Sequence, residues 1–390
     1  MSIETLLVGP TGHGGGEGVY IDTIQACAPA EVRYRVAGPF HHGAPGARCQ
    51  LVTEVLLNRV VHPLTIPDMG LRALRLSERL DLVHVHAHPI RLTKIGSTPV
   101  VMSEGSSSAV YLGDYLGWSR AKLAGRFART RRIYRATGVY DRLLAQERAA
   151  LVYVFSNWAR DVNIDWGADP DKLEVVYPGF PRQPEIERPR GEHFRFLFVG
   201  TDFERKGGYE LVEAFAALAR LQPDVRLTIV SNDPARPRLD YLQRSWVSPA
   251  RRQRVLEQLT QLRRDGLVER RDLTDRGRLF SECYPSADAF VMPAHAEGFG
   301  FTNVEAMSFG LPVISSTAGP IPEVVEHERT GLLVGAGDVD ALTGAMFRLV
   351  SERDATRRMG QAARHDFLAR FTMDTFRESL GRVYRRALER

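Results

Sequence analysis

The chain has 390 residues, 44% of them hydrophobic, and this length indicates two or three domains rather than one core. Its formal charge of +5 favours anionic partners such as phosphates, nucleotides or acidic lipids. It has no apolar run of the ~18 residues that cross a membrane, no signal-peptide pattern and only three scattered cysteines, so we expect a cytoplasmic protein with neither a disulfide framework nor a structural metal.

Short apolar runs typical of strands alternate with stretches of helical pattern, which predicts parallel sheets with helices on both faces. The strands expected in a first sheet are Thr5–Gly9, Val32–Ala37, Leu80–His86, Pro99–Ser103 and Leu151–Ser156. Those expected in a second sheet are Phe194–Gly200, Arg226–Ser231, Ala287–Pro293, Pro312–Ser316 and Gly331–Val334. Residues 178–193, rich in proline and charge, indicate a linker. The fold class is therefore α/β, with two doubly wound, Rossmann-like domains facing a cleft and ligands beyond the carboxyl ends of the strands.

A glycine-rich loop, residues 9–18 (GPTGHGGGEG), follows the first predicted strand and precedes a helix expected near Val19. Its five glycines after Thr11 allow close backbone approach, and the helix start offers free N–H groups to an anion, so a phosphate or a sugar fits there. Neither the GxGxxG dinucleotide fingerprint nor the Gly-Lys-Ser/Thr of a P-loop can be laid on this loop. A flexible strand-to-helix turn remains the alternative.

Three histidines, His84, His86 and His88, alternate at the end of the third predicted strand, which places them on one side of it. Metal binding is one interpretation. Because metal ligands usually converge from more than one element, a cleft-lining or structural role is favoured.

A basic segment, residues 118–135, carries seven basic residues and no acid, interleaved with aromatic and aliphatic side chains. Such a helix can lie on an anionic membrane with its aromatic residues at the headgroup boundary. A solvated arginine face or an oligomer contact is the alternative. Nucleic-acid binding is not expected, since no recognition motif accompanies the charge.

Two adjacent cations, Arg205 and Lys206, stand just before the predicted helix Tyr209–Leu221. A helix start is the end where the helix dipole disfavours positive charge, so their position indicates an anionic ligand. A diphosphate would suit both side chains. Two solvated charges on an exposed turn are the alternative.

Two glutamates, Glu297 and Glu305, bracket the turn from Gly298 to Gly300, which opens a helix with Thr302 as its expected N-cap. Thr302 and Glu305 have the spacing of a capping box, which is the structural alternative for Glu305. Capping cannot explain Glu297, which lies outside the helix. The two carboxylates can accept hydrogen bonds from a sugar and a ribose while the N–H groups of the turn face phosphate. Glycoside hydrolysis is another reading of such a carboxylate pair.

These residues belong to a longer pattern: the glutamate pair is followed by AMSFGLPV (306–313), GPIPE (319–323) and TGLLV (330–334). The pattern closely resembles the retaining glycosyltransferases of family four, of GT-B fold. The resemblance covers the C-terminal half and, more weakly, the N-terminal half. VGTDFERKG (199–207) is most similar to the lipopolysaccharide glucosyltransferase branch.

The resemblance implies a role for each matching residue. Glu305 would hold the ribose of a nucleotide-sugar, Glu297 would reach the donor sugar, and Arg205 with Lys206 would neutralise the diphosphate. Backbone amides would serve the donor at Gly298, Phe299, Gly300, Phe301 and Thr302. In the N-terminal half, Gly14, Gly15, Gly16 and Glu17 would lie near the donor phosphate and the acceptor, with His86 and Ser106 also on the acceptor side.

The sequence departs from the family pattern at three places. The Thr-x-His after the fourth strand reads Met102-Ser-Glu104, so Glu104 would replace the histidine as a catalytic residue. Pro-Asn-Gly is reduced to Pro178-Gly179, and Pro320 takes the place of the second glycine of Gly-Gly-x-Pro-Glu. The donor site is left intact, whereas the acceptor-side chemistry is in doubt.

The implied reaction moves a sugar, with retained anomeric configuration and no essential metal or cofactor, from a nucleoside diphosphate, UDP above all. The acceptor would be a hydroxyl of a glycan, a lipid-linked glycan or a small molecule. Residues 1–180, with a returning helix at 373–390, would form the acceptor-side domain, and residues 181–372 the nucleotide-sugar domain. Peripheral attachment to the inner membrane face would follow from the basic segment. The alternatives are a sugar-nucleotide epimerase of GT-B fold and a catalytically silent nucleotide-sugar-binding subunit.

Overall fold

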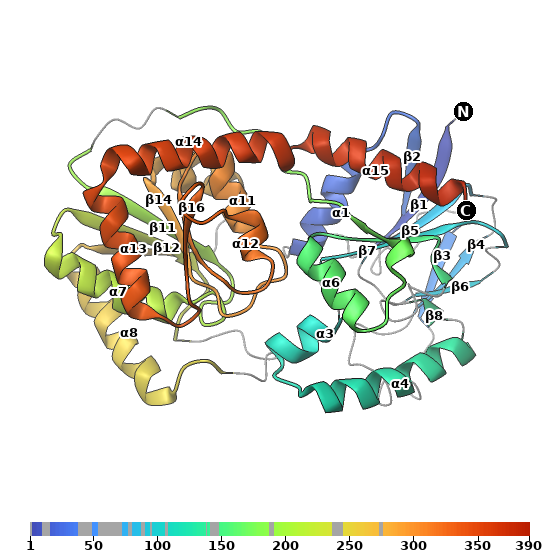
Figure 1. The fold of residues 1–390 in the computed structure, drawn as a ribbon, viewed down its shortest axis with the longest axis horizontal. Coiled ribbons are helices and arrows are strands. Elements are labelled where there is room, and N and C mark those ends of the chain that lie inside the picture. The colour runs from blue at the N-terminus through green and yellow to red at the C-terminus, as the bar shows by residue number, and fades with distance from the viewer. Residues whose placement is uncertain are drawn as a thin grey trace. The chain divides into compact units, whose positions relative to one another are not determined.

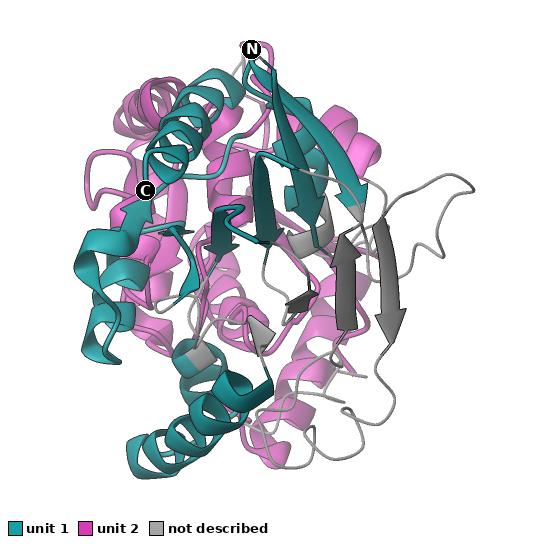
Figure 2. Cartoon of the chain, turned by 90° about the vertical axis from the view of Figure 1, so that its right-hand side faces the viewer, with its two compact units in different colours: residues 1–179, 373–390 teal, residues 180–372 magenta. Residues whose placement is uncertain are grey.

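The computed structural model divides the chain into two compact units, Met1–Gly179 with Met373–Arg390 (unit 1) and Phe180–Thr372 (unit 2) (Figure 2). The structure describes residues 2–9, 16–37, 49–53, 72–76, 80–86, 90–93, 96–105, 108–137, 139–140, 148–186, 191–235, 245–272 and 276–390. In this part of the chain no helix is both long enough and apolar enough to cross a membrane.

Unit 1 is built on a six-stranded parallel sheet of order β10-β9-β7-β5-β1-β2 (Figure 1). The strands are β1 Ile3–Val8, β2 Val32–Ala37, β5 Leu82–His86, β7 Val100–Glu104, β9 Leu151–Val154 and β10 Leu173–Val175. β1 pairs in parallel with β2 on one side and β5 on the other, so the order reverses between β1 and β5. β5, β7 and β9 are buried along their whole length, although β5 and β7 carry polar side chains towards their carboxyl ends.

Helices and a second sheet complete unit 1. The helices include α1 Gly16–Ala26, α4 Arg120–Thr137, α6 Asn157–Asp165 and α15 Met373–Leu388, with the short α3 Ser108–Val110, a π-helical turn Tyr111–Tyr115 and a 3₁₀ turn Pro170–Lys172. α15 packs on β7 and β9 of the large sheet (Figure 1). The second sheet has four strands, β3 Cys49–Thr53, β4 Arg72–Leu76, β6 Ile90–Thr93 and β8 Val139–Tyr140. The sequence did not predict this sheet.

Unit 2 repeats the doubly wound plan, with a six-stranded parallel sheet of order β13-β12-β11-β14-β15-β16. The strands are β11 Phe194–Gly200, β12 Val225–Ser231, β13 Val268–Arg271, β14 Ala289–Met292, β15 Val313–Ser316 and β16 Gly331–Val334. The longer helices are α7 Gly208–Leu221, α8 Pro249–Arg264, α11 Phe301–Ser308, α13 Val339–Ser351 and α14 Arg353–Arg370. Shorter turns are α9 Arg276–Arg278, a π-helical turn Leu279–Cys283, α10 Tyr284–Ser286 and α12 Ile321–Val324.

The strand order of unit 2 reverses between β11 and β14, which pair in parallel. Loops that leave the carboxyl ends of such neighbouring strands diverge to opposite sides of the sheet, and the crevice between them is where doubly wound folds bind ligands. The loops concerned are residues 201–207 after β11 and residues 293–300 after β14.

The two ends of unit 2 lie together. The N–H of Phe180 donates a hydrogen bond of 2.8 Å to the carbonyl of Phe371, and Phe180 forms a parallel bridge with Thr372. Unit 2 is therefore a single continuous segment inserted between β10 and α15 of unit 1.

The basic helix α4 corrects one expectation. Its larger apolar side chains, Leu123, Phe127 and Tyr134, are buried, and Leu123 and Phe127 join a small apolar cluster against which Trp118 packs. The aromatic residues therefore face the interior of unit 1 instead of reaching outward to a headgroup boundary. The exposed surface carries arginine, lysine and small residues only.

Candidate functional site

The loops at the switch point of unit 2 are joined to each other by hydrogen bonds and ion pairs. The N–H of His295 donates to the carbonyl of Arg205 at 2.8 Å, and Nη1 of Arg205 donates to the carbonyl of Ala296 at 2.8 Å. The ammonium of Lys206 forms an ion pair with the carboxylate of Glu297. Two predicted motifs, Arg205-Lys206 and Glu297, thus form one site.

Glycine is required where the first loop turns into α7. Gly207 has φ +76°, and a Cβ atom built on it would lie 2.1 Å from the carbonyl oxygen of Pro293. A Cβ on Gly208 would lie 2.4 Å from the ring of Phe203. A side chain at Gly207 would therefore push the loop away from Pro293, and one at Gly208 would displace the ring of Phe203 within the loop.

The two cations of this loop are buried and paired. Arg205 is 9% exposed and Lys206 is 8% exposed. Nε of Arg205 donates to Oδ2 of Asp202 at 3.2 Å, and Nη1 lies 3.6 Å from Oε2 of Glu297. The electrostatic cost predicted for two cations at a helix start is therefore offset by two carboxylates. The reading of Arg205 and Lys206 as solvated charges on an exposed turn is wrong.

The ionisation of the pair follows from burial and charge together. Burial alone would raise the pKa of Glu297, but the charges of Lys206 and Arg205, with hydrogen bonds from Lys206 and the N–H of Gly298, bring that pKa below its usual range. Burial lowers the pKa of Lys206, and Glu297 opposes that effect. Lys206 and Glu297 therefore form a buried ion pair beyond the carboxyl ends of β11 and β14.

Glu305 belongs to a second group of contacts, on α11. The hydroxyl of Tyr284 donates to Oε2 of Glu305 at 2.7 Å, and Nη2 of Arg276 lies 2.9 Å from Oε1. Burial raises the pKa of Glu305, and Arg276, Tyr284 and Lys206 oppose that rise. Neither Arg276 nor Tyr284 was predicted, because both lie in short helical turns without a recognisable motif.

The capping-box reading of Glu305 is wrong. The N-cap of α11 is Gly300, at φ 95°, with no side-chain capping bond, so Thr302 is not the N-cap. The hydroxyl of Thr302 donates to Sδ of Met292 at 3.1 Å instead. Glu305 is directed to Tyr284 and Arg276, so each of its carboxylate oxygens has a side-chain partner and neither caps the helix.

The glycine turn between Glu297 and α11 is held by contacts of its own. The N–H of Gly298 donates to Oε1 of Glu297 at 3.1 Å, and the carbonyl of Gly300 accepts from Asn303 at 2.9 Å. Phe299 is buried, with its ring 5.8 Å from that of Phe301. The turn is thus held from both sides, and the positive φ of Gly300 sets the direction in which α11 begins.

In unit 1, His84 and His86 converge on one hydroxyl. Oγ of Ser103 lies 2.8 Å from Nε2 of His84 and 2.8 Å from Nδ1 of His86, and Nδ1 of His84 lies 2.7 Å from the hydroxyl of Tyr384. Both histidines are fully buried. His88 lies outside the described residues. Within the ranges described, no three or more His, Cys, Asp or Glu side chains are grouped so that they could hold a metal ion.

The remaining predicted residues of unit 1 are only partly visible. Glu104 ends β7 and is buried. Gly16 opens α1 with Glu17 next to it, but the side chain of Glu17 is not among those described. Gly14, Gly15 and Ser106 fall outside the described ranges.

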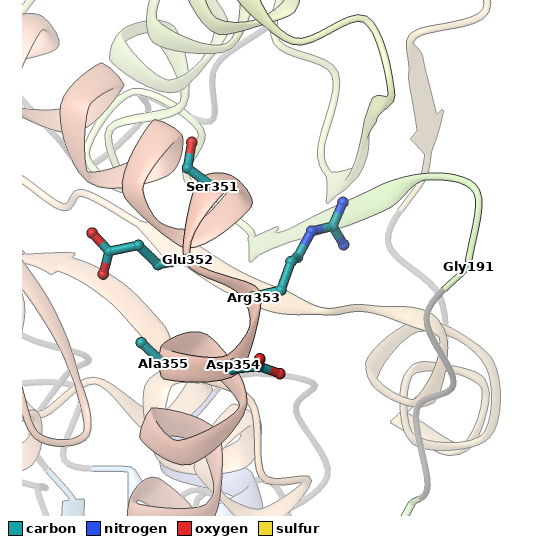
Figure 3. Close-up of a pocket in the computed structure, with 6 residues that line it drawn as sticks. All are labelled: Gly191, Ser351, Glu352, Arg353, Asp354 and Ala355. Atoms are coloured by element: carbon teal, nitrogen blue, oxygen red, sulfur yellow. The ribbon is translucent and has the colours of Figure 1, made fainter.

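A hollow of about 570 Å³ in unit 2 lies away from these groups (Figure 3). Its lining comes from Gly191, which precedes β11, and from residues 351–355 at the junction of α13 and α14. The guanidinium of Arg353 lies 4.5 Å from the ring centre of Phe194, the first residue of β11. The hollow is therefore at the amino-terminal edge of the strands, opposite the edge at which doubly wound sheets bind ligands.

Comparison with known proteins places the chain among sugar-transferring enzymes. A family model described as Glycosyl transferases group 1 matches residues 193–352. The chain is 30% identical over 278 residues to the alpha-maltose-1-phosphate synthase of Mycolicibacterium smegmatis, covering 65% of this chain and 67% of that protein. It is 28% identical over 328 residues to a glycogen synthase of Mycobacterium tuberculosis, covering 81% and 72%. A GDP-mannose-dependent phosphatidylinositol monomannoside mannosyltransferase of the same species is 28% identical over 346 residues, covering 83% and 82%.

Solved structures match the fold over nearly the whole chain. The Anabaena protein HepE in complex with UDP and glucose has a TM-score of 0.65 at 17% identity, covering 97% of this chain and 98% of that one. Sucrose-phosphate synthase from Thermosynechococcus elongatus has a TM-score of 0.65 at 19% identity, covering 98% of both chains. The lipopolysaccharide outer core galactosyltransferase WaaB has a TM-score of 0.60 at 14% identity, covering 97% and 98%. With its two six-stranded parallel sheets, the chain has the GT-B fold.

Proposed function

Because the chain belongs to the group 1 glycosyltransferases of family four, which are nucleotide-sugar-dependent and retaining, we propose that it uses a UDP-sugar and binds it in unit 2. The observation that carries this proposal is the joining of Lys206 to Glu297 at the switch point of unit 2. A diphosphate at that crevice meets two cations, and the sugar attached to it meets a carboxylate. Glu305, beside the same glycine turn, takes the ribose.

In the proposed mechanism, the positive charges of Arg205 and Lys206 are already in position before the sugar is transferred. As the bond between the anomeric carbon and the diphosphate oxygen breaks, negative charge grows on the leaving group, and Arg205 and Lys206 stabilise that charge more than they stabilise the bound donor. An acceptor hydroxyl bonds to the same face of the anomeric carbon, and its proton passes to the departing phosphate. Glu297 keeps Lys206 in place and contacts the donor sugar.

The base of the donor nucleotide needs a test of its own. The Anabaena HepE structure contains UDP, while one relative is named for GDP-mannose, so relatives differ in their donors. Calorimetric titration with UDP, GDP and ADP, on the wild type and on Glu305→Ala, tests the proposal. We expect UDP to bind and Glu305→Ala to weaken it at least about tenfold, or about 1.4 kcal/mol. The absence of binding by all three nucleotides would refute the proposal.

We propose a glycan, a lipid-linked glycan or a small molecule as the acceptor, recognised by unit 1, with the lipopolysaccharide glucosyltransferase branch as the nearest in its Arg205-Lys206 loop. The exposed charges of α4 support an anionic membrane surface near such an acceptor, and because its aromatic residues are buried, the attraction that α4 offers is electrostatic. Sedimentation with vesicles of anionic and of zwitterionic lipid tests this. Binding to anionic vesicles alone, lost at high salt, is the expected result.

The position of Glu104 favours a second candidate. Glu104 stands where the family pattern has a histidine, and it is buried at the end of β7. A binding subunit that takes up the nucleotide-sugar without turning it over would tolerate that change. Acceptor-dependent turnover separates the candidates, because a transferase needs an acceptor, an epimerase does not, and a binding subunit shows neither activity.

A further inference from the structure

Both carboxylate oxygens of Glu305 have a partner from the segment 276–284. The hydroxyl of Tyr284 donates to Oε2 at 2.7 Å, and Nη2 of Arg276 lies 2.9 Å from Oε1. The two partners differ in access to solvent, since Tyr284 is fully buried and the side chain of Arg276 is 38% exposed. Arg276 is therefore the partner that a ligand approaching Glu305 would meet.

We propose that Arg276 is a positioning and specificity-determining residue, which holds Glu305 ionised and oriented so that it accepts hydrogen bonds from the two hydroxyls of a ribose. This inference rests on the proposed function, since it concerns the same nucleotide site. It adds a residue that lies outside the glutamate motif and outside the Arg205-Lys206 loop.

Glu305 has hydrogen-bond acceptor sites left over for a ligand. An ionised carboxylate offers about four lone-pair sites, and Tyr284 and Arg276 take one each, which leaves about two. Two hydroxyl donors of a cis-diol match what is left. A protonated Glu305 would lose one acceptor and present a donor to the diol, which fits it less well.

Arg276 is held in place by the aromatic ring of Phe280. Its guanidinium lies 5.0 Å from the ring centre of Phe280, and Phe280 packs edge-on against Tyr284 with ring centres 5.5 Å apart. The cation and the hydroxyl that hold Glu305 are thus joined through one phenylalanine. A guanidinium supported in this way fixes the carboxylate in one orientation, whereas an unsupported one would let it rotate.

The ionisation of Glu305 depends on the charged and polar groups around it. The groups that face it are Arg276 from α9, Tyr284 from α10 and Lys206 from the loop before α7. Burial raises the pKa of Glu305, and the charge of Arg276 is the largest influence against that rise. Since ribose binding uses the ionised form, nucleotide affinity should be full above this pKa and fall as the pH decreases through it. Without the charge of Arg276, nucleotide affinity should be lost at a higher pH than in the wild type.

Calorimetric titration of the full chain with UDP and with 2′-deoxy-UDP, from acidic to neutral pH, tests the inference, because burial raises the pKa of the Glu305 carboxyl and so moves its protonation towards neutral pH. The variants are Arg276→Gln, which removes the charge, and Arg276→Lys, which keeps it. Arg278→Ala is the matched control, because Arg278 lies on the same helical turn and pairs with Glu282 instead of Glu305. Thermal melting confirms that each variant is folded.

We expect Arg276→Gln to weaken UDP about tenfold at neutral pH, to move the acidic loss of affinity to higher pH, and to reduce the preference for UDP over its 2′-deoxy analogue. Arg276→Lys should keep the pH profile of the wild type, and Arg278→Ala should match the wild type throughout. If Arg276→Gln keeps the affinity, profile and preference of the wild type while Glu305→Ala loses affinity, this inference is refuted and the proposed function stands. If Glu305→Ala also binds UDP normally, the ribose contact that the proposed function assigns to Glu305 fails as well, and if no nucleotide binds to the wild type, the proposed function itself fails.

Discussion

The ammonium of Lys206 is paired with the carboxylate of Glu297, 91 residues further along the chain. Both side chains are about nine-tenths buried, at 10% and 11% exposure. A substitution that breaks the pair should therefore change both the free energy of unfolding and the proposed activity. Replacing either partner alone leaves a buried charge without its main counter-charge.

Glu297→Ala should lower the free energy of unfolding by about 3 kcal/mol, because it leaves Lys206 charged in a buried site. Chemical denaturation measures this. The double variant Lys206→Met/Glu297→Ala should recover part of the loss, since no charge is then stranded. Glu257→Ala, at an exposed position on α8, is the control and should change stability by less than about 0.5 kcal/mol. Equal stability of the wild type and Glu297→Ala would show that the pair does not stabilise the fold.

The same pair sets a pH dependence of stability. Folding lowers the pKa of Glu297, so its stabilising effect is present above the ordinary glutamate pKa of about 4 and disappears as the pH falls through the lowered value. Unfolding free energies measured across this acidic range should therefore fall more steeply for the wild type than for Glu297→Gln. Parallel curves for the two proteins would contradict the assignment.

Lys206→Met should reduce kcat by about 100-fold, because it removes a preorganised cation from the leaving diphosphate. The comparison is made in a steady-state assay of the donor and acceptor identified by screening. Lys172→Met, in unit 1, should leave kcat unchanged and serves as the control. A Lys206→Met enzyme with the kcat of the wild type would remove Lys206 from the proposed mechanism.

Two glycines with the same backbone conformation provide a matched test of the loop geometry. Gly207 has φ +76° and no room for a Cβ, whereas Gly266 has φ +71° and no atom within 4 Å of a Cβ. Gly266→Ala should therefore cost only the conformational penalty of about 1 kcal/mol. Gly207→Ala should cost clearly more and should also weaken nucleotide binding, because the loop must leave Pro293. Equal unfolding free energies for the two variants would refute this account.

Tyr384→Phe should lower the free energy of unfolding by about 1 to 3 kcal/mol. The hydroxyl of Tyr384 lies 2.7 Å from Nδ1 of His84 and 2.8 Å from the hydroxyl of Tyr34, and its removal leaves buried polar atoms without that partner. Denaturant melts of the full chain measure the loss. Arg382→Ala, on the exposed face of the same helix, is the comparison and should have little effect. A Tyr384→Phe protein as stable as the wild type would contradict the prediction.

Strands with a clear apolar pattern could be predicted from the sequence, the edge strands β2 and β16 among them, whereas short charged strands could not. β11 and β16 have the predicted bounds, and α15 begins at the predicted residue and ends at Leu388 instead of residue 390, because apolar or amphipathic runs define these elements. β13, with the sequence VERR, and β10, with three residues, were missed because short edge strands carry charges and no clear alternation. The four-stranded sheet was missed because its strands pair across long stretches of chain, and pairing of that kind leaves no local pattern.

The same distinction applies to the site. Arg205, Lys206, Glu297 and Glu305 were singled out by residue type and by their place after predicted strands. The sequence could not show that Lys206 and Glu297 are partners, since that depends on where β11 and β14 meet in the sheet. Thr302 was assigned wrongly as a cap because Gly300 takes the N-cap position through its positive φ. The inward direction of the α4 aromatic residues depends on the packing of Trp118 and Phe127, which composition does not reveal.

The pairing of Phe180 with Phe371 and Thr372 has a consequence for truncation and fusion. A fragment comprising residues 180–372 begins and ends at adjacent points, so it can be excised whole or joined end to end through a short linker. Unit 1 cannot be excised in this way, because α15 is supplied from beyond unit 2. A deletion that removes residues 373–390 should therefore damage the large sheet of unit 1 while leaving unit 2 intact.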